Sequence, residues 1–201
     1  KIKIHRMKNI ALTVMLSVMM SVAKGQSIFE PPIDKISVTA SFTDQNIKVD
    51  GLLNEEAWRS AKVLSNFTQV EPNQGDPSAF RTFVRVLYSD KYLYIGAFCQ
   101  DSEGKKGIRV PDLTRDFSFL TNDTFAMGID GFLDERNSVT LATNPYGTQK
   151  DYLSFDDTFF DGQWNGLWKV RTSITEEGWY AEFQIPWKTL RYSQVGSSPK
   201  K

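Results

Sequence analysis

The sequence predicts an all-β protein, an antiparallel β-sandwich with one short N-terminal helix, on three observations. Segments rich in β-branched and aromatic residues, roughly eight in number, recur along the chain with turn-forming residues between them. In residues 168–174 and 179–185 apolar and polar side chains alternate, which is typical of strands with one face on a core. The strand–helix–strand rhythm of a parallel sheet is missing, so two packed antiparallel sheets are the expected architecture.

The first 25 residues are expected to be a signal peptide, with extra residues before Met7. Basic side chains precede an uncharged apolar run over residues 10–22, and Ala23 and Gly25 are the small residues that a signal peptidase reads. The run is short for a membrane span, and a retained N-terminal anchor is the alternative. We therefore expect an exported protein, in the periplasm, in the outer membrane or outside the cell.

Removal of these 25 residues from the 201 leaves 176, a usual size for one domain. Residues 26–45 are expected to form a linker and the first strand, and residues 46–193 the sandwich. Residues 194–201 are polar and are expected to begin a linker to a further region downstream.

Removal of the leader also changes the charge, because it contains five of the 24 basic residues and none of the 24 acidic ones. The resulting net charge of −5, without basic runs, argues against nucleic acid as a partner. The only histidine, His5, leaves with the leader, which excludes catalytic and zinc sites built on histidine. No haem is expected, because Met127 is the one axial ligand left. Cys99 has no partner for a disulfide and is expected to be a small buried residue on a strand.

The first elements of the mature chain are two short strands, expected at residues 36–42 and 47–49. Asn54 is expected to cap a short helix with an acidic first turn, and the helical spacing of its apolar residues places Trp58 in the core. Residues 71–77 are rich in glycine and proline and are expected to form a loop.

The later elements are strands with turns or loops between them. A polar segment at residues 101–115 is expected to be a long exposed loop, residues 144–147 a turn, and residues 187–190 one helical turn. The strands are expected at residues 82–88, 92–99, 125–129, 139–143, 168–174 and 179–185.

Five short motifs follow one another in a recognisable order over residues 47–192. They are Val49-Asp50-Gly51 leading to Leu53-Asn54-Glu55-Glu56-Ala57-Trp58; the strand pair at 84–90 and 92–95; Asn122-Asp123-Thr124-Phe125 before Ile129-Asp130; Asn144-Pro145-Tyr146-Gly147 before Asp151; and Gly178-Trp179, Glu182 and Ile185-Pro186-Trp187. In this order they resemble the family 9 carbohydrate-binding modules. The resemblance is closest to the version at the N-terminus of large exported bacterial proteins, where an outer-membrane barrel is expected to follow.

The resemblance implies a non-catalytic β-sandwich that holds an oligo- or polysaccharide and often calcium, as an accessory to polysaccharide binding or breakdown. The best-understood members clamp a sugar between two tryptophans, one of them just before the Asn-Asp motif. Here Leu120 and Thr121 stand at that place, and neither can stack on a sugar. The alternative function is therefore a structural or interaction cap on an outer-membrane β-barrel, without a sugar site.

Sugar binding needs flat aromatic faces and planar polar groups, and residues 156–168 combine both in one segment. Trp164 is the residue we expect to contact the sugar. Trp168 either contacts it as well or begins the inward-facing side of a strand. Asn122 and Asp123 are added because they match the family motif. The alternative is a surface loop whose aromatic side chains cover the edge of the sandwich.

Four carboxylates could together hold calcium, which takes hard oxygen ligands. They are Asp151, Asp156, Asp157 and Asp161. Their spacing differs from that of an EF-hand loop, and solvated loop acids and turn-forming side chains are the alternative.

Overall fold

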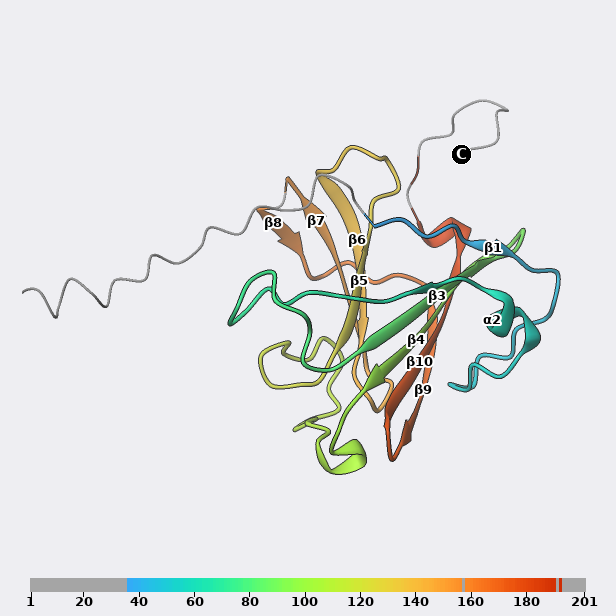
Figure 1. The fold of residues 1–201 in the computed structure, drawn as a ribbon. Helices are drawn as coiled ribbons and strands as arrows, with labels where there is room; N and C mark the ends of the chain where they lie inside the picture. Colours follow the sequence, from blue (N-terminus) through green and yellow to red (C-terminus); the bar gives the residue numbers. More distant parts are fainter. Residues whose placement is uncertain (1–35, 157, 191, 193–201) are drawn as a thin grey trace, which may run out of the picture. The chain divides into compact units, whose positions relative to one another are not determined.

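Two β-sheets pack face to face in the residues that the computed structural model describes, 36–156, 158–190 and 192 (Figure 1). The larger sheet has the strand order β1-β3-β4-β10-β9, with β2 also beside β3, and the smaller sheet has the order β5-β6-β7-β8. Every pair is antiparallel except β1 with β3. The strands are β1 (Ser41–Phe42), β2 (Val63–Leu64), β3 (Thr82–Tyr88), β4 (Tyr92–Gln100), β5 (Phe125–Ile129), β6 (Asn137–Thr143), β7 (Gln149–Phe155), β8 (Phe159–Asp161), β9 (Lys169–Thr175) and β10 (Gly178–Pro186).

All described residues belong to one compact unit, Lys35–Lys201. The predicted signal peptide and the predicted linker at residues 194–201 lie outside the described residues. Within the described residues, no helix is both long enough and apolar enough to cross a bilayer.

The predicted short helix is present as α2 (Glu56–Ser60), but the predicted cap is wrong. Glu55 is the residue at the N-cap, and its side chain makes no capping hydrogen bond; Gln45 Oε1 instead accepts the backbone N–H of Ala57 in the first turn, at 3.3 Å. Asn54 instead belongs to a turn, in which its backbone N–H donates to the carbonyl of Leu52 at 2.9 Å. The helical turn expected near the end is the 3-10 helix η2 (Trp187–Thr189), and the long loop after β4 contains another, η1 (Gly104–Lys106).

The main core lies between the two sheets. Trp179, Ala181, Phe183 and Ile185 of β10 are all buried in it, which confirms the predicted alternation of that strand. Cys99 of β4 packs against this core and is half-buried, and burial raises the pKa of its thiol to about 12. The other buried side chains of the core are Val84, Ile95, Ala97, Val139, Leu141, Leu153, Val170 and Leu190.

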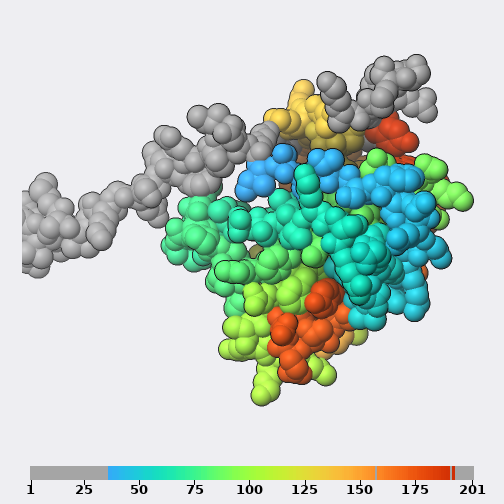
Figure 2. Space-filling view, turned by 45° about the vertical axis from the view of Figure 1, so that its right-hand side comes forward, coloured from blue at the N-terminus to red at the C-terminus, as the bar shows by residue number. Residues whose placement is uncertain are grey.

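A second core covers the outer face of the larger sheet, the face that points away from the smaller one. Figure 2 shows this side, where the segment coloured blue to teal lies in front of the sheet. Ile47 and Val49 are buried here, although the strand predicted at residues 47–49 is not formed. Trp58 is 1% exposed and packs in this second core, so the prediction that it fills a core is confirmed.

A buried carboxylate ties the second core to the sheet. Glu182 on β10 is fully buried, and its Oε2 accepts the backbone N–H groups of Asp50 at 2.9 Å and Gly51 at 3.0 Å. Its Oε1 accepts the indole N–H of Trp58 at 3.1 Å. Gly96 lies opposite Glu182 on β4, and a Cβ there would come within 3.0 Å of the Trp58 ring. Burial raises the pKa of Glu182, whereas its three donors lower it.

Six of the strands lie close to their predicted bounds. β3 and β5 match their predicted bounds, and β4, β6, β9 and β10 differ by one or two residues. The segment predicted as a strand at residues 36–42 pairs only over Ser41–Phe42. Sequence reasoning missed β2 and β7, and β8 lies inside the predicted loop at residues 156–168.

Candidate functional site

Trp164 and Trp168, the two tryptophans predicted as sugar contacts, pack against the main core. Trp168 stacks on Phe183 with 5.6 Å between the ring centroids and 13° between the ring planes. Trp164 is half-buried and folds over Gly166, where a Cβ would come within 2.6 Å of the indole ring. These contacts favour the inward-facing role that was left open for Trp168. The sugar contact of Trp164 stays a prediction.

Asp151 on β7 is 1% exposed and has a hydrogen-bond partner for each oxygen. Its Oδ1 accepts from Arg115 Nη2 at 2.5 Å. Its Oδ2 accepts the backbone N–H of Gly166 at 2.6 Å and the indole N–H of Trp168 at 3.1 Å. A buried charge with these partners holds two loops against β7, so its role in the structure is to position backbone.

The calcium expectation finds no support in the described residues. Asp156 pairs with Arg136 at 2.6 Å, and Asp161 accepts the backbone N–H of Gln163 at 3.0 Å. Asp157 lies outside the described residues. Among the described residues no three His, Cys, Asp or Glu side chains form a group that could hold a metal ion. Calcium binding at these carboxylates stays an untested prediction.

Asn122 and Asp123, the other two predicted sugar contacts, have different environments. Asn122 is buried, and its amide donates to the Ser118 carbonyl at 3.0 Å and to Thr121 Oγ1 at 3.2 Å, which stabilises the turn before β5. Asp123 is half-buried and lines a hollow, where its Oδ2 accepts the backbone N–H of Arg109 at 2.7 Å. The structure therefore does not bring these two side chains together with Trp164 and Trp168 in one site.

Three aromatic side chains do come together on the outer face of the smaller sheet. Tyr152 lies between Phe119 and Phe160, with 6.3 Å and 5.7 Å between the ring centroids. Each neighbouring pair meets edge to face, at 67° and 80°. We call these three residues the aromatic row. It joins the loop before the Asn122 motif to the segment at 156–168, the two parts of the sequence from which a sugar site was expected.

Strand alternation explains why two members of the row share a face. Asp151 and Leu153 of β7 are buried on the inner side, so Tyr152 between them points outward. Phe160 of β8 pairs with Ser154, which is two residues from Tyr152 and therefore lies on the same outer face.

Phe119 reaches the row from the loop that precedes β5. The backbone N–H of Asp116 donates to the Gln149 carbonyl at 3.0 Å, and Lys150 Nζ donates to the Asp116 carbonyl at 3.2 Å. Lys150 Nζ also lies 5.0 Å from the centroid of the Phe119 ring, a cation–π distance. The loop is therefore held to β7 at Asp116 and at Phe119.

The row is open to solvent beside strands with small side chains. Phe119 is 40% exposed and Phe160 is 64% exposed. On β5, which β6 separates from β7, the outward-facing residues are Ala126 and Gly128, both small and exposed. The outer face thus offers apolar rings and an ammonium group together.

Sequence reasoning missed Phe119, Tyr152 and Lys150 because it missed β7. Polar residues occupy both faces of this strand, since the inward-facing Asp151 is charged. The turn predicted at residues 144–147 was the available signal, because a strand that enters a tight turn usually leaves it as a hairpin.

Residues 49–199 match the family model described as carbohydrate family 9 binding domain-like. No curated protein matches the chain. One similar solved structure is a carbohydrate-binding module family 9 from Caldicellulosiruptor kristjanssonii in complex with glucose; it is 12% identical over 80% of this chain and 70% of that chain, with a TM-score of 0.49. Another is a module of the same family and organism in complex with cellotriose, 14% identical over 74% and 67% of the two chains, with a TM-score of 0.43.

Proposed function

The chain belongs to the carbohydrate family 9 binding domain-like family, and we propose that its aromatic row is the surface that holds carbohydrate. Domains of this family bind and do not catalyse, so the domain is not an enzyme. The observation that carries the proposal is the exposure of Phe119 and Phe160 on either side of Tyr152.

The chemistry of the row suits the two kinds of surface that a sugar ring presents. The C–H face of a pyranose is apolar and packs on an aromatic ring, and its hydroxyl groups need polar partners at the edge. Phe160 and Phe119 provide rings at the two ends of the row. The Tyr152 hydroxyl and the Lys150 ammonium provide polar groups between and beside them. An extended glycan would lie along the row.

Isothermal titration with cello-oligosaccharides, xylo-oligosaccharides and other glycans tests this proposal. We expect Phe160→Ala to weaken binding by about fivefold to tenfold, because it removes one stacking ring. Phe159→Ala is the matched control, since Phe159 is 68% exposed on the same strand but points to the opposite face. If wild type and Phe160→Ala bind equally well, the row is not the surface that holds carbohydrate. If no glycan binds, the domain does not recognise carbohydrate at all.

We propose in addition that the protein is exported and serves as an accessory to polysaccharide binding or breakdown. The support is the leader-like pattern of residues 1–25, with small residues at Ala23 and Gly25. N-terminal sequencing of protein recovered from the periplasm or the medium should find Gln26 as the first residue. Recovery of a chain that keeps residues 1–25 in the membrane fraction would contradict export of a free domain.

The second candidate function is an interaction domain that caps an outer-membrane barrel and has no sugar site. Leu120 and Thr121 favour it, because they stand where the best-understood family members have a stacking tryptophan. Leu120 is 96% exposed, which suits a contact with another protein surface better than a contact with a sugar. The two candidates differ in the titration above, since a cap domain gives no heat with glycans.

A further inference from the structure

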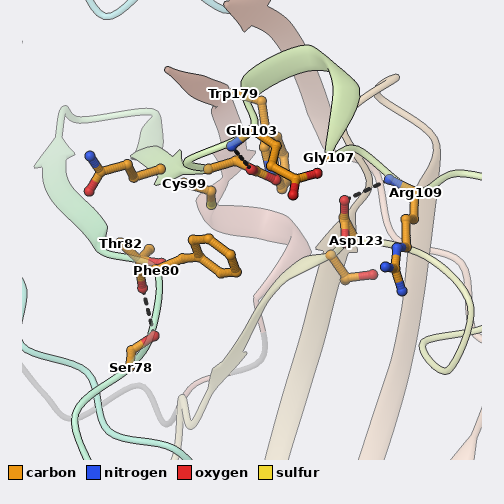
Figure 3. A pocket seen from close by; sticks show the side chains of 12 residues that line it. Ser78, Phe80, Thr82, Cys99, Glu103, Gly107, Arg109, Asp123 and Trp179 are labelled. Atoms are coloured by element: carbon orange, nitrogen blue, oxygen red, sulfur yellow. Dashed lines mark hydrogen bonds between the residues drawn. The ribbon is translucent and has the colours of Figure 1, made fainter. Parts of the chain in front are cut away.

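A hollow of about 490 Å³ opens at one end of the sandwich, within the roughly 300–1,000 Å³ range of small-molecule sites (Figure 3). It lies where β3, β5 and β10 begin and β4 ends, and it shares no residue with the aromatic row. Its lining combines charged, hydroxyl and aromatic side chains, among them Phe80, Glu103, Asp123 and Trp179.

Carboxylates outnumber cations in this lining. Asp101, Glu103 and Asp123 face a single guanidinium, that of Arg109. Two of these carboxylates are held in place by backbone N–H groups: Asp101 Oδ1 accepts from Glu103 at 2.7 Å, and Asp123 Oδ2 accepts from Arg109 at 2.7 Å. Among the described residues, the second oxygen of each and the whole Glu103 carboxylate have no hydrogen-bond donor. The lining therefore presents fixed acceptors with an excess of negative charge.

A donor at the wall of the hollow also lacks a partner. Trp179 is 4% exposed, and its indole N–H has no acceptor among the described residues. The fully buried side-chain atoms without a partner in the described residues are Glu55 Oε2 and Arg85 Nε, so the Trp179 nitrogen is not sealed in the core. Because the side chain lines the hollow, the indole N–H is available to an oxygen atom of a ligand there.

The third feature of the hollow is an aromatic ring at its rim. Phe80 is 50% exposed, and Figure 3 shows its ring on one side of the space with Glu103 and Asp123 on the other. A ring opposite carboxylates suits a ligand that has an apolar face and a positive charge, since both the ring face and the carboxylates attract a cation.

We propose that this hollow binds a sugar with a free, protonated amino group, a ligand class that rests on the proposed carbohydrate function. The ammonium group is held by Glu103 and its neighbouring carboxylates, the C–H face of the sugar packs on Phe80, and a ring or hydroxyl oxygen accepts the Trp179 N–H. A neutral sugar leaves the excess negative charge without a counter-charge, and a polyamine has no oxygen for the indole N–H.

Titration with two matched ligands tests the proposal: β-1,4-linked glucosamine oligomers and their fully N-acetylated counterparts, at a slightly acidic pH that keeps the amine protonated. We expect the amine form to bind wild-type protein about fivefold more tightly, and added salt to reduce the difference. Glu103→Gln should abolish most of this preference. Glu176→Gln is the control, because Glu176 is an exposed carboxylate beside the same end of the sandwich that does not line the hollow.

The outcomes separate this inference from the proposed sugar surface. Equal affinity for the two oligomers, no binding of the amine form, or a preference that survives in Glu103→Gln overturns the inference, whatever happens at the row. Phe160→Ala should weaken neutral glycans and leave the amine preference intact, whereas Phe80→Ala should weaken the glucosamine oligomer alone. Circular dichroism of each variant confirms that the exposed substitutions leave the fold unchanged.

Discussion

The outer faces of the two sheets differ in what covers them. On the larger sheet the N-terminal segment covers the outer face, and its Trp58 is buried in the second core with an exposed fraction of 1%. On the smaller sheet the loop before β5 covers part of the face, but Phe160 is 64% exposed and Phe119 is 40% exposed. One sandwich thus has a closed face, which adds a second core, and an open face, which leaves aromatic rings in water.

This difference shows which residues of the family motifs maintain the structure. Asp50, Gly51, Trp58 and Glu182 come from the first and the last motif of the series, and they meet in one set of hydrogen bonds on the closed face. The motifs that made the family recognisable therefore describe how the sandwich is closed. The open face is built from residues outside those motifs, which explains why the fold was easier to infer than the ligand surface.

Trp58→Ala is expected to give the largest effect, because it removes the largest fully buried side chain. The variant should lose about 3–5 kcal/mol of unfolding free energy, the usual cost of deleting a buried aromatic ring. Urea unfolding followed by fluorescence or circular dichroism measures it. Phe160→Ala on the open face is the control and should change stability by no more than about 0.5 kcal/mol. Similar losses in the two variants would mean that the two faces do not differ as described.

Glu182→Gln is expected to have the next largest effect. An amide of the same shape has one oxygen, so it cannot accept from Trp58 and from the backbone of Asp50 and Gly51 as the carboxylate does. A donor left unpaired in a buried site costs about 1–3 kcal/mol. Glu176→Gln, an exposed change of the same chemistry, should be neutral in the same urea titration. A neutral Glu182→Gln would show that the closed face needs packing alone.

The pH dependence of stability in wild type and in Glu182→Gln is a further test of the closed face. Burial raises the pKa of Glu182, so the folded state holds this proton more tightly than the unfolded chain, whose glutamates titrate at about 4.3. The stability that this proton contributes is fully present below that value and is lost as the pH rises through the raised pKa. The advantage of wild type over Glu182→Gln should therefore shrink from about pH 4 towards neutrality. An advantage that grows with pH would mean that the three donors outweigh burial.

The fold could be predicted from the sequence where the apolar and polar alternation of a strand matches the burial of its two faces. β10 has one apolar face in the main core, and its alternation could be seen directly in the sequence. β7 escaped prediction because a buried charge, Asp151, occupies its inner face, and this charge is tolerated only through contacts with Arg115 and Trp168 that no local pattern reveals. The cap assigned to Asn54 failed because the helix begins one residue later than expected, with Glu55 at the N-cap.

The candidate site was harder to predict, because aromatic composition does not tell which rings are free. Trp168 looked suited to a sugar, yet its ring packs on Phe183 and its N–H bonds to Asp151. Phe160 lies in the segment that was singled out, but its exposure depends on a register with Ser154 that only the fold defines. Asp123 was chosen from the family motif, and its place in the hollow follows from a loop contact with Arg109.

Lys150→Met is expected to have the smallest effect and tests how firmly the open face is held. The change keeps an apolar stem but removes the ammonium that lies 5.0 Å from the Phe119 centroid and bonds to the Asp116 carbonyl. An exposed cation–π contact is worth about 0.5–1 kcal/mol, so global stability should fall by no more than that. The larger response should be local, with faster hydrogen exchange in residues 112–121 and an unchanged rate in α2 on the closed face. Lys188→Met, an exposed lysine on η2, is the control. If exchange in 112–121 stays as slow as in wild type, the loop is held by Phe117 and backbone contacts, and the open face is as firmly built as the closed one.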